Sequence, residues 1–460
     1  MSLGVILSLL FFLLCVVFVF MRIKLGLMFV SVLACSCSIS LDVSAQNLRD
    51  AVVFALENHP SVEGARLGYA AAEHGKDATF SGFFPEISIG VMAGRTFQDN
   101  ATSRGLAVTR GAAYSGLGEG NITMRQMLFD GFEVRNRVRS ANARMQSLDY
   151  TLMDIEGLVT LRVAQSYVDI LRIHHALRIL SEQSTSIKDY EKRITDMVSE
   201  GVADEVELQQ ARDVAMIIEG VRSEYEGQLV SARAMYAEAA GQPFVDGVDH
   251  TFVSLASFIN EDAAVAVALS KENHPALQSA RMDSKAARHD MRAEHARMYP
   301  DVNGELSYAK TDKKDVIGGE TEDARAVIRM SWNFSTGGKE FSSVRQKRYE
   351  HYEMAAKHEA LEREIERDIY QAYANYHTLE RKVALAIDRV DLNEKLMAAY
   401  DAKFEGARIT LLGLMRAESQ LFNARLAEID NKYYLLSAEY GVLASLGTLK
   451  DILISEKDEE

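Results

Sequence analysis

Hydrophobic and polar positions alternate in four short segments of the chain. In the last segment, Ile328, Met330 and Trp332 share one face, while Arg325 and Arg329 share the other. An apolar face opposite an arginine-bearing face is typical of strands in a membrane barrel, where lipid-facing and lumen-facing residues alternate. We therefore predict four transmembrane strands, with Ile328, Met330 and Trp332 facing lipid. The segments are EISIGVMAG (86–94), NITMRQMLF (121–129), DVNGELSYA (301–309) and DARAVIRMSWNF (323–334).

Elsewhere the apolar positions recur every three or four residues. Leu161, Ala164, Val168 and Leu171 follow this spacing, which is typical of a helix with one apolar face. The longest such segments have about 65 residues, which at 1.5 Å per residue gives roughly 100 Å. The predicted helices are 48–80 and 261–299 before the strand pairs, and 132–199, 204–240, 339–403 and 411–446 after them.

The same succession of motifs occurs twice. ENHP stands at 57–60 and at 272–275, and in both copies an aromatic residue followed by proline comes 25 positions later, at Pro85 and Pro300. Because several motifs keep their order, we predict a tandem duplication. The predicted divisions are a leader (1–45), a first repeat (46–242) with a hairpin at 86–129, a linker (243–260), a second repeat (261–449) with a hairpin at 301–334, and an acidic tail (450–460).

The ENHP motif predicts a capped bend between two helices. Asn58 and Asn273 can each cap a helix that starts two residues later, and proline suits the first helical turn. The histidines of the motif have no neighbours at metal-ligand spacing. We therefore interpret them as structural, and we predict no metal and no cofactor.

The first 45 residues have the composition of a targeting segment. Residues 1–20 are almost wholly apolar, and a second apolar stretch ends at the small residues VSA (43–45). This pattern predicts a signal peptide cleaved after Ala45, with Met21 as the true start and residues 1–20 as an upstream extension. One long leader, or a membrane anchor of about 20 apolar residues, is the alternative.

All three cysteines, Cys15, Cys35 and Cys37, lie inside this leader. A chain cleaved after Ala45 would contain no disulfide and no thiolate metal site. The residues before Cys35, VLA (32–34), weakly resemble a lipoprotein cleavage box. Lipidation of Cys35 is therefore a second candidate for the fate of the leader.

The composition argues against two classes of protein. The formal net charge is −15 and no Lys/Arg-rich block stands out, which argues against a nucleic-acid partner. The GxSxG, P-loop and HExxH motifs are absent from the sequence. We predict that the chain is not an enzyme and that the energy for any transport comes from a partner.

Four strands are too few to close a barrel by themselves. Open sheet edges do not occur in lipid, and the smallest closed membrane barrels have about eight strands. The strands therefore predict an α+β membrane protein whose barrel is shared between chains. The alternative is a soluble periplasmic coiled-coil scaffold, in which the alternating segments are ordinary half-buried strands.

Taken together, the motifs resemble the TolC-type outer membrane channels. The marks are LRDAVVFALENHP, the aromatic-Pro pair, the FDG or FSTGG turn after the second strand, and a Gly-led reversal at the helix tip. The resemblance covers residues 48–449. It implies a homotrimer in which four strands per chain build a 12-strand β-barrel in the outer membrane, in contact with lipid and continued by an α-helical barrel through the periplasm.

The resemblance also implies the exit duct of a tripartite export system. Such channels dock onto a periplasmic adaptor protein and an inner-membrane transporter, either ABC or proton-driven. The stretch ESQLFNARLAEIDNKYYLLSAEYGVLASLGTL (418–449) is most similar to the branch linked to type I protein secretion. The outer membrane component of a small-molecule or drug efflux pump is the alternative.

The resemblance places a periplasmic gate at the helix tips. Glu207 stands six residues after Gly201, where these channels carry an acidic residue facing the pore. Gly413 and Arg416 stand where the family has two aspartates, so its cation-attracting ring is altered here. We hypothesise that Glu207 pairs with Arg416 across adjacent coils and holds the tip closed, with Arg408 as a second candidate. The alternative is solvated helix-end charges worth under about 1 kcal/mol.

Overall fold

The computed structural model describes residues 47–97, 114–245, 254–313, 319–333, 335–405 and 409–455. The predicted leader with Cys35, the gate candidate Arg408 and the end of the acidic tail lie outside the described residues. Within those stretches, no helix has both the length and the apolar character that a membrane span requires.

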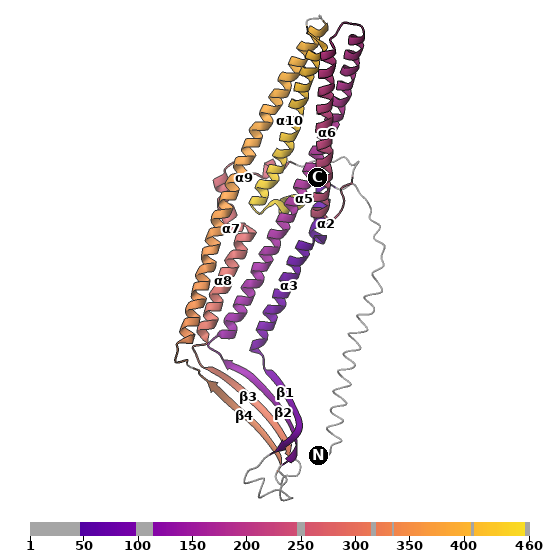
Figure 1. Cartoon of the computed structure of the whole chain (residues 1–460). Coiled ribbons are helices and arrows are strands. Elements are labelled where there is room, and N and C mark those ends of the chain that lie inside the picture. Colours follow the sequence, from indigo (N-terminus) through magenta and orange to yellow (C-terminus); the bar gives the residue numbers. More distant parts are fainter. Residues whose placement is uncertain are drawn as a thin grey trace. The chain divides into compact units, whose positions relative to one another are not determined.

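The chain runs twice through the same order of elements: two helices, two strands and two further helices (Figure 1). The first series is α2 (Leu48–Asn58), α3 (Pro60–Phe80), β1 (Glu86–Phe97), β2 (Tyr114–Phe129), α5 (Glu133–Ser199) and α6 (Glu205–Ala240). The second is α7 (Ala263–Asn273), α8 (Pro275–Ala296), β3 (Asp301–Lys313), β4 (Glu320–Ser331), α9 (Lys339–Glu405) and α10 (Leu411–Ser445), followed by α11 (Leu449–Ser455). The predicted strands and long helices are confirmed.

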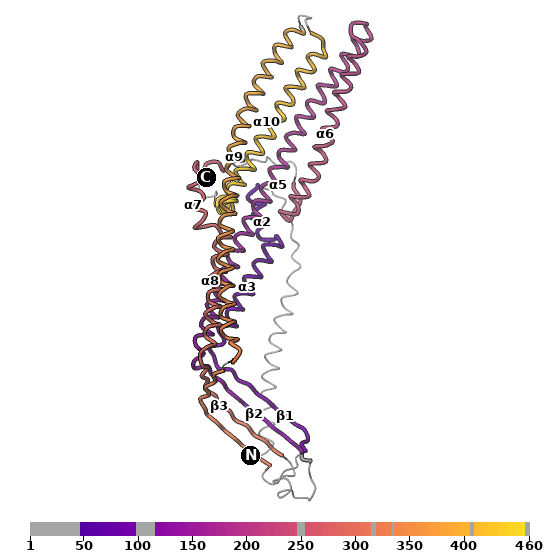
Figure 2. Tube along the Cα trace, turned by 60° about the vertical axis from the view of Figure 1, so that its left-hand side comes forward, coloured from indigo at the N-terminus to yellow at the C-terminus, as the bar shows by residue number. Residues whose placement is uncertain are grey.

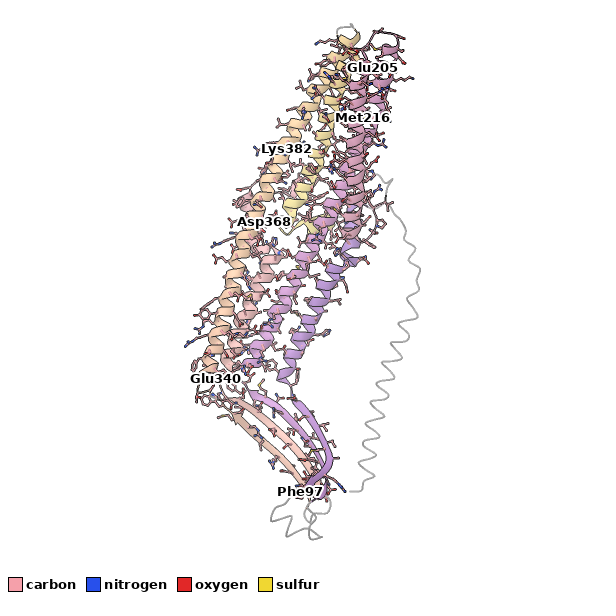
Figure 3. All side chains as sticks on the ribbon, in the orientation of Figure 1. Phe97, Glu205, Met216, Glu340, Asp368 and Lys382 are labelled. Carbon is pink, nitrogen blue, oxygen red and sulfur yellow. The ribbon has the colours of Figure 1, made fainter. Side chains whose placement is uncertain are left out.

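Helices α5 and α9, of 67 residues each, pack against different shorter helices along their length (Figure 2). Near the sheet, α3 lies beside α5, and α8 packs on both α5 and α9. Further on, α6 lies beside α5, and α10 packs on both α5 and α9. We call α5–α6 the first coil and α9–α10 the second coil. Figure 3 shows Phe97 at the far end of β1 and Glu205 at the opposite end, where the coils turn.

The apolar stripe of α5 is the centre of the core. Ala164, Val168 and Leu171 are buried, as the spacing of three and four predicts. Two tyrosines, Tyr236 of α6 and Tyr440 of α10, are buried against the same cluster. The stripe therefore fixes which side of α5 faces α6 and α10.

The strands form one antiparallel sheet in the order β1-β2-β3-β4. Residues directly opposite one another lie on the same face. One row of paired residues, on what we call the apolar face, runs through Ile87, Met124, Leu306 and Ala326. The next row, on the polar face, runs through Glu86, Arg125, Glu305 and Val327. The predicted alternation thus holds across all four strands.

The apolar face is exposed in the single chain. Val91 of β1 is 85% exposed and Ile328 of β4 is 75% exposed. Met330 lies on the same face of β4, and Trp332 follows immediately after the strand. The Trp332 Nε1 donates to the carbonyl oxygen of Met298 at 3.1 Å, which holds the indole at the junction between the sheet and the helices.

The ENHP corners have the predicted bend but a different cap. The Nδ1 atoms of His59 and His274 accept hydrogen bonds from the Ser61 amide (3.1 Å) and the Ala276 amide (3.2 Å). The expected asparagine caps are wrong, because each asparagine is the last residue of the preceding helix and its side-chain amide donates back to that helix. Histidine can take the cap position because its unprotonated Nδ1 is an acceptor.

The turn after β2 requires its glycine. Gly131 has φ +65°, and a Cβ there would lie 2.5 Å from the carbonyl oxygen of Ala296. The Asp130 carboxylate accepts from the amides of Phe132 (2.9 Å) and Val134 (2.6 Å), so it caps the start of α5. This turn is where the sheet passes into the first coil.

Candidate functional site at the helical coils

The tip of the first coil is a tight turn between α5 and α6. Gly201 has φ +74°, a left-handed conformation that favours glycine. The two amides that follow it donate to the carbonyl oxygen of Met197 at 2.9 and 3.2 Å, which ends α5 with satisfied carbonyls. Asp204 then caps α6. The gate candidate Glu207 therefore lies, half-buried, in the first turn of α6.

The tip of the second coil places the other gate candidates at the start of α10. The Gly413 amide donates to Thr410 Oγ1 at 3.2 Å, so Gly413 belongs to the helix cap. Arg416 is exposed, and its Nη2 donates to Gln210 Oε1 of α6 at 3.1 Å. Within the chain, Arg416 therefore contacts Gln210, about one helical turn beyond Glu207, in place of the charge pair that the sequence suggested.

A second contact joins the coils just behind the tip. Ser186 Oγ of α5 donates to the Glu418 carboxylate of α10. Burial, and then the hydrogen bond to Glu418, raises the pKa of Tyr190 of α5 well above its usual value. Within the first coil, Arg212 of α6 pairs with Glu191 of α5 at 3.2 Å. Near the tip, α10 is therefore hydrogen-bonded to both helices of the first coil.

A buried arginine joins the coils at mid-length. Arg172 of α5 is only 7% exposed. Its Nη1 donates to Asp430 Oδ1 of α10 and its Nε donates to Asp169 Oδ1, both at 2.9 Å. The hydroxyl of Tyr225, on α6, donates to the other oxygen of Asp430 at 3.2 Å. The rings of Tyr225 and Tyr434 lie 5.8 and 5.4 Å from the guanidinium carbon. We call these five residues the Arg172 cluster.

Arg172 keeps its charge because the guanidinium is paired. Burial alone would lower the pKa of Arg172, but hydrogen bonds to Asp430 and Asp169 and the charge of Asp169 outweigh it and raise the pKa. Burial, and then the charge of Asp430, raises the pKa of Tyr225 to about 12. A buried charge that loses its partner costs several kcal/mol. The cluster therefore ties the first coil firmly to α10.

Glu439 of α10 holds the segment that joins the two series of elements. Its side chain is almost fully buried, and Oε2 accepts from Ser254 Oγ and from the Leu255 amide, both at 2.9 Å. Burial raises the pKa of Glu439, although these hydrogen bonds act in the opposite direction. Leu255 is itself buried in the core. One carboxylate therefore anchors this joining segment to α10.

The described residues offer no metal centre: among them, no three His, Cys, Asp or Glu side chains gather as ligands. The residues that sequence reasoning missed are Arg172, Asp430 and Gln210. One signal was present for Arg172, which interrupts the apolar stripe between Leu171 and Ile173. Its partner Asp430 is 258 positions away, and nothing local identifies it.

An exposed apolar sheet face that continues into paired helices of roughly 100 Å is the architecture of an outer membrane channel subunit. The sequence matches the outer membrane efflux protein family over residues 52–242 and 266–448. The chain belongs to this family. It is an outer membrane channel protein that extends into the periplasm, and it is not an enzyme.

Related proteins agree with this assignment. The outer membrane efflux protein BepC of Brucella suis is 18% identical over 410 residues, which are 88% of this chain and 86% of BepC. The crystal structure of CusC matches with a TM-score of 0.77 at 14% identity, covering 87% of this chain and 92% of that chain. VceC of Vibrio cholerae matches with a TM-score of 0.76 at 14% identity, covering 87% and 96%. At these identities the solved structures show the fold alone.

Proposed function

We propose that three copies of this chain form the exit duct of a tripartite export system. The observation that carries the proposal is a four-stranded sheet whose two outer edges are unpaired among the residues that the structure describes and whose apolar face is exposed. Only a closed barrel leaves no unpaired edge in lipid. Three chains with four strands each reach the 12 strands expected from the resemblance.

Aromatic side chains support a membrane position for the sheet. Exposed rings gather where the sheet meets the helices, and aromatic girdles mark both interfaces of membrane barrels. The rings there belong to Phe83, Phe84, Phe129, Phe132, Tyr299 and Trp332. Toward the loops, the apolar face carries Tyr308 and Phe97. This arrangement favours a lipid-facing surface over the alternative of a soluble scaffold.

For the cargo, we propose type I protein secretion. The support is the resemblance of residues 418–449, which form most of α10 in the structure. A periplasmic adaptor would bind the coils, and an inner-membrane ABC or proton-driven transporter would supply the energy. The test is a deletion strain: loss of a secreted protein from the medium supports secretion, whereas drug hypersensitivity with unchanged secreted proteins supports efflux.

We further propose that the two series of elements arose by tandem duplication and that the coil tips form the periplasmic gate. The repeated element order supports the duplication, with the first repeat at 46–242 and the second at 261–449. For the gate, the support is the exposed contact between Arg416 and Gln210, which can open at little cost. Arg416 and Glu207 of neighbouring coils would line the closed end.

The duct is tested directly with protein extracted from outer membranes in mild detergent. Its mass before and after heating and the single-channel conductance of the same sample distinguish the duct from the scaffold. A trimer that conducts ions supports the proposal. An elongated, non-conducting dimer would replace it with the scaffold.

A further inference from the structure

A cavity of about 390 Å³ lies where the sheet passes into the helices. It is lined by the end of β2, the start of α5, the end of α8 and the first turns of α9. α8 packs on both of the longer helices here (Figure 1). Gly131 brings the turn after β2 directly against α8, because no side chain separates that turn from the Ala296 carbonyl. The cavity therefore belongs to the junction between the sheet and the helices.

The lining of this cavity combines basic side chains with aromatic rings. The basic side chains are Arg292, His295 and Arg348, and the rings are Phe129, Phe132 and Tyr299. Among the described residues that line the cavity, none is acidic. Arg135 lies beside it, with its guanidinium carbon 5.9 Å from the centre of the Phe132 ring. Such a lining suits a ligand with an anionic head and an apolar body.

The two arginines of the cavity are available to a ligand. Both Arg292 and Arg348 are exposed, and neither forms an ion pair with a residue that the structure describes. The carboxylates two positions along from them, Glu294 and Glu350, pair with other cations at 3.4 and 2.7 Å. An arginine has a planar fork of N–H donors that fits two oxygens of a phosphate. The cavity therefore offers two such forks to an anion.

Further cations surround the cavity on α5 and α8. Burial lowers the pKa of His289 of α8, and the positive charges of Arg292, Arg139, Lys285 and Arg288 lower it further. These four cations therefore lie close enough to act on one side chain. An anion that approaches the cavity is attracted by this wider positive field as well as by its direct contacts.

The corresponding helix of the first series has the opposite charge. Arg288 and Arg292 of α8 follow the second ENHP. At the same distances after the first ENHP, α3 carries Glu73 and Asp77. Both series nevertheless keep an aromatic residue before the proline that precedes their first strand. The geometry that the two junctions share therefore does not account for the cations of α8.

The cavity lies at the level of the aromatic side chains that mark the membrane interface. Phe129 pairs with Val302, which pairs in turn with Met330, so Phe129 lies on the apolar face. Arg292 lies one helical turn, about 6 Å, before Ala296, the last residue of α8. In a sheet that crosses the outer membrane, rings at this position lie among lipid headgroups. The arginines then lie within reach of the headgroup phosphates.

We propose that the cavity binds an anionic phospholipid of the leaflet that faces the periplasm, with Arg292 and Arg348 donating to its phosphate and the aromatic rings covering its acyl chains. The proposal rests on the membrane position proposed above. Basic pockets between helices at a membrane surface bind lipid phosphates in this way. Two probes separate the requirements of the site: phosphatidylcholine has the acyl chains without a net charge, and inorganic phosphate has the charge without the chains.

The first test uses protein extracted from outer membranes in mild detergent. Phosphatidylglycerol is added in increasing amounts, and bound lipid is counted by native mass spectrometry. Arg292→Gln combined with Arg348→Gln should need roughly tenfold or more lipid for the same occupancy. The matched control is Arg281→Gln with Arg363→Gln, which removes the same charge from exposed positions farther along α8 and α9.

Three results of this test overturn the site. The first is equal affinity of the double variant and its control for phosphatidylglycerol. The second is equal binding of phosphatidylcholine and phosphatidylglycerol by the wild type. The third is full displacement of the lipid by millimolar inorganic phosphate, which would make the cavity a site for soluble anions. The lack of a conducting trimer in the same sample refutes the proposed duct instead, so the two failures are distinguishable.

The single tryptophan of the chain provides an independent readout in vesicles. Trp332 donates to the carbonyl oxygen of Met298, which directly precedes Tyr299 of the cavity. Brominated lipids quench tryptophan fluorescence at short range. As a minor component of phosphatidylcholine vesicles, brominated phosphatidylglycerol should quench Trp332 roughly twofold or more above the same fraction of brominated phosphatidylcholine. Arg292→Gln with Arg348→Gln should remove this difference. Equal quenching by the two lipids in the wild type overturns the proposal.

Discussion

The two coils are joined at mid-length and at the tip by contacts of similar geometry but different burial. At mid-length, Arg172 is 7% exposed and donates to Asp430 at 2.9 Å. At the tip, Arg416 is exposed and donates to Gln210 at 3.1 Å. Water can replace Gln210 as the partner of the exposed Arg416, whereas the guanidinium of Arg172 is buried and has little access to water. The same helices thus have a fixed joint at mid-length and a contact that can open at the tip.

The largest expected effect is that of Arg172→Ala. The change leaves Asp430 partly buried and without its guanidinium, so we expect a loss of about 3 kcal/mol in the free energy of unfolding. Thermal unfolding of the purified protein in detergent measures it. Arg178→Ala is the control on the same helix, because Arg178 is exposed and its contacts with Glu182 and His175 both stay within α5. Equal melting temperatures of the two variants would contradict a fixed joint at Arg172.

A smaller effect is expected at the second ENHP corner. His274→Ala removes the cap of α8 and should cost about 1 kcal/mol, whereas His274→Asn should retain most of the stability. Burial lowers the pKa of His274 below its ordinary value of 6.5. The unfolded chain then binds the proton more tightly, so stability is present above about pH 6.5 and decreases as the pH falls through the folded pKa. Melting curves from pH 5 to 8 should show a shallower slope in His274→Asn than in the wild type, because His175 and His289, whose pKa values burial also lowers, still contribute.

The pH dependence at Glu439 has the opposite sign. Burial raises its pKa above the ordinary 4.5, so the native state binds the proton more tightly than the unfolded chain does. Stability should therefore decrease as the pH rises from 4.5 through the folded pKa. Glu439→Gln should reduce this slope, to which Asp154 also contributes, while Glu394→Gln, on an exposed pair with Arg425, should leave it unchanged. An unchanged slope in Glu439→Gln would show that the carboxylate is not the source.

The smallest effect on stability is expected for Arg416→Ala, under about 0.5 kcal/mol, because the lost hydrogen bond is exposed. Its effect should be on conductance, since the proposed gate opens at this contact between the coil tips. Conductance of the purified channel in cation and anion gradients is the measurement. Arg425→Ala, on the same helix but away from the tip, is the control. Identical conductance in Arg416→Ala and wild type would refute the gate.

Much of the fold follows from local sequence. The alternation in residues 86–94 and 323–334 predicted the apolar face, and the sheet confirms it because neighbouring side chains on a strand must point to opposite faces. The break at ENHP was also predictable, because proline cannot continue the preceding helix. Its cap was not: asparagine and histidine are adjacent in the motif, and the exact end of the preceding helix decides which of them reaches the free amide.

By itself, the sequence determined the spacing of apolar positions in each segment and the breaks between segments. These two features determine the order of helices and strands in this chain. The tertiary structure decided the contacts on which the coils depend: Arg172 with Asp430, Arg416 with Gln210, and Glu439 with Leu255. These partners are between 184 and 258 positions apart. Which of them meet depends on how each helix is rotated and shifted along its neighbour. That arrangement comes from packing of the whole apolar stripe, which no single local segment encodes.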